Sequence, residues 1–396
     1  MSTTSDKQLS LEDTEIAFAA RSNSELLKMD WMFSLMNKPT LNKMAVNSLL
    51  TSISLRLPIK SIVKSTIFNH FCGGETLEDC TKTMNALSGF GIGTILDFSV
   101  EGEKTETAFD HVVEETIGTI RIAAKRKDVP FAVFKTSGIA SVELLEKVQA
   151  GKTLEPAEQE ALERARKRFA TICGEAGKNG VKIFVDGEES WIQDIIDQWT
   201  YEEMGLYNQS KALIYNTFQL YRADMLGNLK NATEDARSAN FILGAKLVRG
   251  AYMEKEAAYA ARNGLKNPIQ PSKDATDKDF DLGCEHCLGN LDRIHFCAGS
   301  HNEKSNLRLA NALDNKGLVR NDHRIWFAQL YGMSDNISYA LAKAGFNVAK
   351  YVPYGPVFSV MPYLVRRAAE NTSVAGQTSR ELSLIQKERK RRSALK

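Results

Sequence analysis

Four side chains near the carboxyl end of the chain are spaced to lie on one face of a helix. Tyr363, Arg366, Arg367 and Glu370 stand at i, i+3, i+4 and i+7, the spacing of neighbours along a helical stripe. Such a stripe is often a solvated charged face. Adjacent guanidinium groups beside an aromatic ring also suit a carboxylate, because each guanidinium can donate two parallel hydrogen bonds to it. The segment therefore predicts either a solvent-facing helix or a site for a carboxylate substrate.

A second candidate lies where the apolar run 243–248 ends in a charge and two small residues. Arg249, Gly250 and Ala251 follow this run directly, and the two small residues would let a ligand approach the backbone closely. Polar residues also end most of the other apolar runs, and catalytic residues of an α/β barrel come from such strand ends. The residues at these other ends are Lys135, Asp186, Gln219, His301, Asn302 and Tyr351.

Two further motifs resemble binding sites but have the wrong context. Residues 88–93 carry spaced glycines, as dinucleotide-binding turns do, but they precede a predicted strand instead of following one. Cys284 and Cys287 form one C-x-x-C pair without a second pair to complete the four ligands of a structural zinc site. We interpret the first motif as a flexible entry to a strand and the second as packing residues, and we predict no metal site.

A scaffold of alternating strands and helices must hold these residues. Eight short apolar runs follow residue 89, with amphipathic segments such as 191–204 and 335–344 between them. Strands that alternate with helices pair in parallel, so eight such units predict an α/β fold of the (β/α)₈ type. A doubly wound open sheet is the alternative. The predicted strands are 94–100, 131–134, 181–185, 212–218, 243–248, 294–297, 325–329 and 347–352.

The barrel is flanked by two other predicted parts. Apolar residues within 14–20 and 61–68 recur at helical spacing and indicate an N-terminal helical arm. A charged helical insertion is predicted at about 140–178, and a helix within it begins near Pro156, a residue type favoured in the first turn of a helix. The predicted parts are the arm at 1–88, the barrel at 89–375 and a basic C-terminal tail at 376–396.

Composition narrows the class of protein. Of the 396 residues 43% are hydrophobic, as is ordinary for a globular protein. The formal net charge is only +2, so the chain lacks the excess of basic residues that is typical of nucleic-acid-binding proteins. The chain has no run of 18 apolar residues and no leader-like start, so the cytoplasm is the expected compartment. The basic cluster 387–392 predicts either a solvated terminus or peripheral contact with anionic lipid on the inner face of the membrane.

The segment 246–252, together with Arg366, Arg367, Glu370 and Asn371, resembles the signature pair of proline dehydrogenases. The resemblance covers roughly 96–374. It implies a distorted (β/α)₈ TIM-like barrel that holds FAD at the carboxyl ends of its strands. It also implies oxidation of L-proline to Δ1-pyrroline-5-carboxylate by hydride transfer to flavin N5, with electrons passed to a membrane quinone. The chain is too short to hold an aldehyde dehydrogenase domain beside this barrel. The next step of proline breakdown is therefore expected to be carried out by a separate pyrroline-5-carboxylate dehydrogenase.

The same resemblance assigns substrate contacts. It implies that Arg366, Arg367 and Lys135 hold the proline carboxylate. Glu370 matches the acid that orients this clamp, and Asp186 matches an acidic residue of the active site. The residues that it places around the proline ring are Tyr252, Leu330, Tyr351 and Tyr363.

For FAD, the resemblance implies two groups of contacts. Thr276, His301 and Asn302 match contacts with the ribose, the phosphates and the adenine. Lys246 stands where many relatives have arginine, and it keeps the positive charge near the flavin but loses the guanidinium fork. The expected contacts with the flavin and the pyrophosphate are Gln219, Lys246, Arg249, Gly250 and Ala251.

Three questions stay open at this point. The family closes its site with a carboxylate near the first strand, and both Asp97 and Glu101 lie there. A hydroxyproline dehydrogenase shares the scaffold, although the bulk of Tyr351 leaves less room for a ring hydroxyl. A non-catalytic flavin-binding regulator is the third alternative, and the full set of clamp residues speaks against it.

Overall fold

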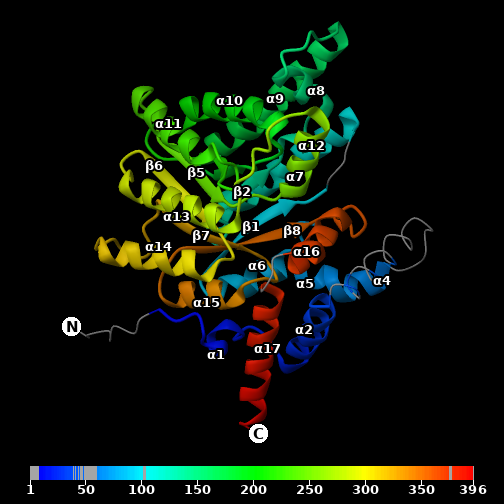
Figure 1. Cartoon of the computed structure of the whole chain (residues 1–396), viewed down its shortest axis with the longest axis vertical. Helices are drawn as coiled ribbons and strands as arrows, with labels where there is room; N and C mark the ends of the chain where they lie inside the picture. Colours follow the sequence, from blue (N-terminus) through cyan, green and yellow to red (C-terminus); the bar gives the residue numbers. More distant parts are fainter. Residues whose placement is uncertain are drawn as a thin grey trace.

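The protein is a barrel of strands enclosed by helices, with α1 (Thr14–Ala17) and α17 (Gln377–Ser393) packed together on one side of it (Figure 1). This computed structural model describes residues 9–38, 60–100, 104–373 and 377–395, and positions 40, 42, 44 and 48. At 368–373, 377 and 378 it describes the backbone. None of the helices described is long and apolar enough to cross a membrane.

Eight parallel strands pair in sequence order, and β1 pairs with β8 to close the barrel. The predicted barrel is therefore confirmed, and the open sheet is excluded. The strands read as apolar runs because both faces of a parallel sheet are covered. Their bounds are β1 Ile92–Phe98, β2 Phe131–Phe134, β3 Lys182–Val185, β4 Ile214–Gln219, β5 Leu243–Val248, β6 Ile294–Gly299, β7 Ile325–Leu330 and β8 Val348–Tyr354.

Helices follow the strands around the outside of the barrel (Figure 1). Those beside the strand ends carry or support the site, and α16 follows the last strand. Their bounds are α7 Glu106–Lys125, α10 Ser190–Tyr207, α11 Met225–Ser238, α12 Met253–Asn263, α13 Lys273–Gly289, α14 Glu303–Asn315, α15 Asp335–Lys343 and α16 Met361–Ser373.

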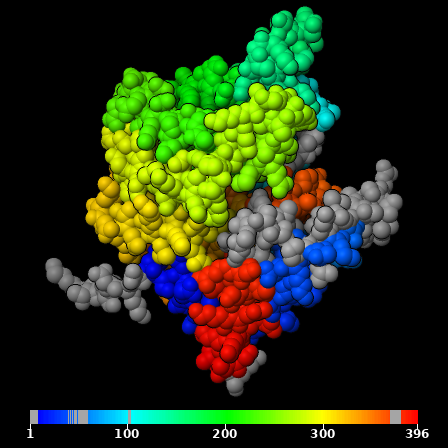
Figure 2. All heavy atoms as spheres, in the orientation of Figure 1, coloured from blue at the N-terminus to red at the C-terminus, as the bar shows by residue number. Residues whose placement is uncertain are grey.

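The predicted insertion is a pair of helices, α8 (Val142–Gln149) and α9 (Pro156–Asn179). Pro156 occupies the first turn of α9, as its fixed φ favours. Glu155 and Glu158 form a reciprocal capping box there, and Gly180 ends the helix with φ 65°. Figure 2 shows that this part of the chain stands out from the body of the molecule.

Aromatic rings fill the interior of the barrel. Phe131 and Phe184 stack with their centroids 4.3 Å apart, and the ring of Tyr215 meets both edge-on. These side chains form one buried cluster with Tyr351 of β8. The interior of the barrel is thus filled by an aromatic floor made of Phe131, Phe184 and Tyr215. Polar groups lie above this floor, at the carboxyl ends of the strands.

The described part of the N-terminal arm is mostly helical, with non-helical stretches such as 18–22 and 72–80 between its helices. Its last helix, α6, packs against β1, and the chain enters that strand through a turn with Gly91 at φ 71°. Residues 88–93 therefore lead into a strand, as the sequence predicted. The described helices are α1 Thr14–Ala17, α2 Asn23–Met36, α4 Lys60–Val63, the π-helical turn η1 Lys64–Phe68, α5 Asn69–Phe71 and α6 Thr81–Ser88.

The predicted basic tail forms a helix, α17 (Gln377–Ser393), that packs on α1 and α2. Figure 2 shows it (red) seated against the N-terminal segment (blue). Leu384 and Ile385 are buried in one apolar cluster with Phe33 of α2. Arg389 pairs with Asp30, and Arg392 Nη2 donates to the Phe18 carbonyl at 2.9 Å. The segment is therefore not a frayed terminus, and several of its cations are used within the chain.

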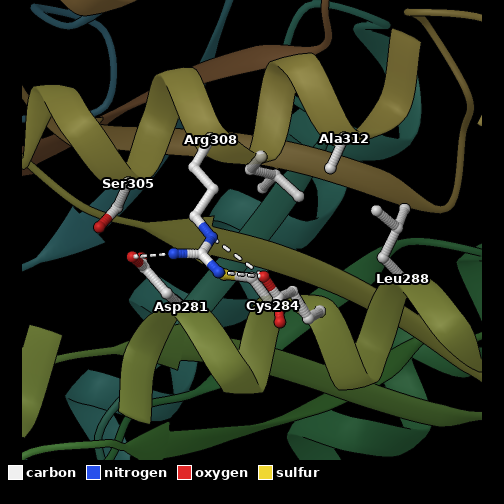
Figure 3. A pocket seen from close by; sticks show the side chains of 8 residues that line it. Asp281, Cys284, Leu288, Ser305, Arg308 and Ala312 are labelled. Atoms are coloured by element: carbon white, nitrogen blue, oxygen red, sulfur yellow. Dashed lines mark hydrogen bonds and ion pairs between the residues drawn. The ribbon is translucent and has the colours of Figure 1, made fainter. Parts of the chain in front are cut away.

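Cys284 and Cys287 are buried on α13, inside the large apolar cluster around the barrel. The cavity beside them, between α13 and α14, has a volume of about 10 Å³ (Figure 3), which is room for about one water molecule. Arg308 of α14 reaches across it to Glu285 at 2.5 Å. This region joins two helices and has no space for a substrate.

Candidate active site

Three buried polar side chains meet above the aromatic floor. Lys246 Nζ of β5 lies 2.6 Å from Asp186 Oδ1, at the end of β3, and the hydroxyl of Tyr351 donates to the same oxygen at 2.8 Å. The ammonium also faces the Tyr351 ring, 4.5 Å from its centroid. Burial and the neighbouring carboxylate raise the pKa of Tyr351, so the phenol stays protonated and donates. The sequence predicted all three residues, and the structure brings them together.

A second carboxyl group, Asp97 of β1, stands near this triad. It is buried, and Ser99 Oγ donates to its Oδ2 at 2.5 Å. Burial raises the pKa of Asp97, the positive charge of Lys135 opposes this rise, and the charge of Asp186 adds to it. Lys135, Asp97 and Asp186 therefore share one polar region at the ends of β1, β2 and β3. Glu101 lies outside the described residues.

Helix α16 closes the site at β7 and β8. Leu330, the last residue of β7, pairs in register with Tyr351 and packs in the same interior cluster. Leu330 also packs in a second cluster, which contains Tyr363 of α16. It thus joins two of the predicted ring contacts, Tyr351 and Tyr363.

The predicted carboxylate clamp lies on this helix. Arg367 is buried, and its guanidinium carbon lies 5.1 Å from the Tyr363 ring centroid. Arg366 is half-buried beside it. Because Arg367 is buried, α16 is not the solvent-facing helix that the sequence offered as one alternative. The side chain of Glu370 lies outside the described residues, so its predicted role stays a prediction.

His301 lies beneath the clamp and is neutral. Burial, together with the positive charges of Lys350, Arg367 and Arg249, lowers its pKa to about 3. Its Nε2 accepts the Leu330 N–H at 3.4 Å, so Nδ1 carries the proton and faces the Ser334 hydroxyl at 2.9 Å. Both ring nitrogens thus contact the protein itself, and the cofactor contact predicted for His301 would use the ring face.

The guanidinium of Arg249, directly after β5, donates hydrogen bonds to three side chains. Its Nε donates to Asp277 at 2.5 Å, Nη1 to Ser300 Oγ at 2.6 Å and Nη2 to Ser305 Oγ at 2.9 Å. The guanidinium carbon lies 4.3 Å from the centroid of the Phe280 ring. Its position is therefore set by α13, α14 and β6 together.

Two other predicted cofactor contacts lie at the starts of the helices that hold Arg249. Thr276 is buried in the first turn of α13, and its hydroxyl donates to the Ser272 carbonyl at 3.3 Å. Asn302 caps α14 by accepting the Ser305 N–H at 3.2 Å. A helix start is a favourable place for phosphate, because its N–H groups and dipole are positive there.

Beyond Arg249 the backbone opens to solvent. Gly250 and Ala251 are exposed, while Tyr252 is half-buried at the start of α12. Gly250 has φ 125°, and a Cβ there would lie 2.3 Å from the Tyr221 ring, so no other residue fits without displacing that ring. The strand end therefore offers backbone N–H groups and a fixed cation side by side, a surface suited to a phosphate-bearing ligand.

The family model for proline dehydrogenase matches residues 80–380, which include every residue of this site. The chain belongs to the proline dehydrogenase family. Of the curated relatives, the carbapenem antibiotics biosynthesis protein CarD of Pectobacterium carotovorum is 36% identical over 84% of this chain and 85% of its own. Proline dehydrogenase 1 of Dictyostelium discoideum is 30% identical over 96% and 74%, and hydroxyproline dehydrogenase of Xenopus laevis is 29% identical over 95% and 88%.

A solved structure shows the same fold. Proline utilization A (PutA) from Bdellovibrio bacteriovorus, inactivated by N-propargylglycine, superposes with a TM-score of 0.71 at 17% identity. The match covers 94% of this chain and 40% of that one. The barrel of this proline dehydrogenase family member is therefore also found as one part of a longer protein.

Sequence reasoning missed Glu188, which supports two of the predicted site residues. Its carboxylate accepts the Ser137 N–H at 2.9 Å, in the loop that carries Lys135, and its carbonyl accepts Gln219 Nε2 at 2.6 Å. Burial raises its pKa to about 7. A charged residue two positions beyond Asp186 at the end of β3 was the signal that could have identified it.

Sequence reasoning also missed the buried ion pairs of Lys350, Asp335 and Arg21, which fix the loop between β7 and α15. Lys350 is fully buried within β8, pairs with Asp335 at 2.9 Å and donates to the Leu330 carbonyl at 3.3 Å. Asp335 also pairs with Arg21 of the N-terminal arm at 3.1 Å. A lysine inside an apolar strand run was the available signal. In this member of the family, a buried ion-pair network therefore holds Leu330, and with it one wall of the site.

Proposed function

We propose that this chain oxidises L-proline to Δ1-pyrroline-5-carboxylate with FAD bound at the carboxyl ends of its strands. One observation carries the proposal: the buried group of Lys246, Asp186 and Tyr351 is joined through Leu330 to the arginine-bearing helix α16. In this arrangement the cations would bind a carboxylate and Leu330 and Tyr351 would form a wall for a small ring, as a cyclic amino acid requires.

The residues present fit a flavin dinucleotide. Lys246 supplies a buried cation, and Arg249 with the exposed backbone at Gly250 and Ala251 supplies donors for a pyrophosphate. Gln219 is held by the Glu188 carbonyl beside them. When bound, FAD supplies the hydride acceptor for the C–H bond next to the proline nitrogen. The chain itself contributes position and charge, and Lys246 is placed to stabilise negative charge.

The substrate carboxylate would be held by Arg366, Arg367 and Lys135, because guanidinium and ammonium groups bind carboxylates with charge-assisted hydrogen bonds. Tyr351 and Leu330 would pack against the ring. Orientation of this kind fixes the reacting carbon without any acid or base acting on it.

Proline is favoured over hydroxyproline as the substrate. The Tyr351 hydroxyl is bound to Asp186, and the ring is 7% exposed within a packed cluster. A side chain fixed in this way cannot turn aside to admit a ring hydroxyl.

In this proposal the electrons pass on to a membrane quinone, and a separate pyrroline-5-carboxylate dehydrogenase uses the product. Peripheral contact with the inner face of the membrane, from the cytoplasm, is part of the same proposal. It does not rest on α17, because Arg389 and Arg392 of that helix are bound to the N-terminal arm.

The purified protein tests the proposal directly. We expect a yellow protein whose colour is released by heat as FAD, and whose flavin absorbance bleaches anaerobically with L-proline. Bleaching should be much weaker with trans-4-hydroxy-L-proline. A protein that binds FAD but is not bleached by proline would be a regulator, and FMN or no flavin at all would contradict the cofactor assignment.

A further inference from the structure

A cavity of about 360 Å³ lies outside the barrel mouth, between helices α8, α10 and α12. These helices are grouped in the upper part of Figure 1. The loop 265–268 and Arg222, which follows β4, complete its lining. The volume is that of a small-molecule site. None of the substrate or cofactor contacts described above lines it.

Arg222 is the buried cation of this cavity. It is 7% exposed, and its Nε and Nη2 donate to Asp224 at 3.1 and 2.7 Å. Its Nη1 is buried and has no hydrogen-bond partner within the described ranges of the chain. A buried donor without an acceptor is costly. Arg222 lines the cavity, so a carboxylate bound there would meet its positive charge.

Carboxylates of the protein also line the cavity. Glu256 accepts the N–H and the hydroxyl of Ser190 at 2.7 and 2.6 Å, and Glu146 accepts the Tyr259 hydroxyl at 2.9 Å. A carboxylate oxygen can accept more than one hydrogen bond, so both groups can also bind an ammonium. Asp194 adds negative charge near Arg222. A ligand with a negative charge alone would therefore be bound poorly.

One wall of the cavity is apolar. The rings of Trp191 and Tyr259 stack with their centroids 4.0 Å apart and their planes 13° from parallel. Ala260 lies beside them, and Leu265 is 59% exposed at the cavity. An exposed leucine beside stacked rings provides an apolar surface that a ligand side chain would cover.

We propose that this cavity binds a free α-amino acid with an apolar side chain. Its carboxylate would bind Arg222, its ammonium would bind Glu146 and Glu256, and its side chain would cover the Trp191 and Tyr259 wall. The site is separate from the proline site, so binding requires no turnover. It borders the active site, because α10 begins four residues after Asp186 and α12 begins directly after Tyr252.

The test is calorimetric titration of the flavin-containing protein with L-leucine. Leucine can also enter the proline site, so Arg367→Met is titrated in parallel to remove that contribution. We expect the leucine site to persist in Arg367→Met. The two singly charged analogues, 4-methylpentanoate and isoamylamine, should each bind at least about tenfold more weakly, since each leaves a charged group of the cavity without its partner.

Variants of the cavity complete the test. Arg222→Met should weaken leucine binding at least about tenfold, while Arg237→Met, which removes a surface arginine from α11, should not change it. If Arg222→Met fails to fold, Ala150→Trp provides the test, because Ala150 is exposed and its enlarged side chain would fill the cavity.

Several results would overturn the proposal. One is the absence of binding up to about 10 mM leucine, where a site with a millimolar Kd would be mostly filled. Another is binding that Arg367→Met abolishes and Ala150→Trp leaves intact. A third is a singly charged analogue that binds as tightly as leucine.

Discussion

The buried ion pair at the barrel mouth allows a quantitative prediction. Asp186→Asn keeps the shape of the side chain but leaves the Lys246 ammonium without its counter-charge. The two side chains are only 10% and 12% exposed, and breaking a buried pair costs about 3–5 kcal/mol. The Tyr351 ring lies 4.5 Å from Nζ and partly compensates the charge. We therefore expect a loss of about 3 kcal/mol in the free energy of unfolding.

The assay is urea unfolding followed by circular dichroism, on the wild type, Asp186→Asn, Tyr351→Phe and the double variant. Tyr351→Phe removes one hydrogen bond to a carboxylate, worth about 1.5–3 kcal/mol. Because both changes affect the same contact, the double variant should be at least about 0.5 kcal/mol more stable than the sum of the single effects predicts. A loss below about 1 kcal/mol in Asp186→Asn, or strict additivity, would refute the reasoning.

Three further predictions concern the site. Arg367→Met should lower kcat/KM for L-proline by about two orders of magnitude or more with FAD content near one per chain; loss of flavin with unchanged proline affinity would contradict the clamp. Tyr351→Ser should shift the ratio of kcat/KM values toward trans-4-hydroxy-L-proline, and an unchanged ratio would exclude Tyr351 from the ring pocket. Burial raises the pKa of Glu188 from 4.5 to about 7, so its ionisation destabilises the fold as pH rises through this range. Glu188→Gln, which stays neutral, should therefore gain melting temperature relative to the wild type between pH 5 and pH 8, and a difference independent of pH would count against a buried carboxyl.

The strands were predictable because each is buried on both faces and reads as an apolar run. Their predicted ends differ from the observed ones by a few residues at most, as for 94–100 against Ile92–Phe98. The insertion was predictable because Pro156 begins a helix. In these cases the physical cause is local, and a short stretch of sequence contains it.

The site was predictable where its residues end a strand, and much less so elsewhere. Asp186 and Lys135 follow apolar runs, so the barrel rule applies to them. Lys350 lies inside a strand, and its partner Asp335 binds Arg21, 314 positions away. The basic residues of α17 suggested lipid, because their acidic partners, such as Asp30, stand at the other end of the sequence. Contacts between distant segments leave no local pattern to recognise.

The loop between β7 and α15 has a consequence for synthesis on the ribosome. Its Ser334 N–H donates to Glu381 of α17, and its Asp335 binds Arg21 of the arm. Arg21 leaves the ribosome early but cannot bind Asp335 until α15 has been translated, and the loop gains its last contact only with α17. Because domains fold as their residues emerge, a nascent chain can close the barrel before the wall behind Leu330 and His301 is secured. The pocket can therefore be completed only after residue 381 has been translated.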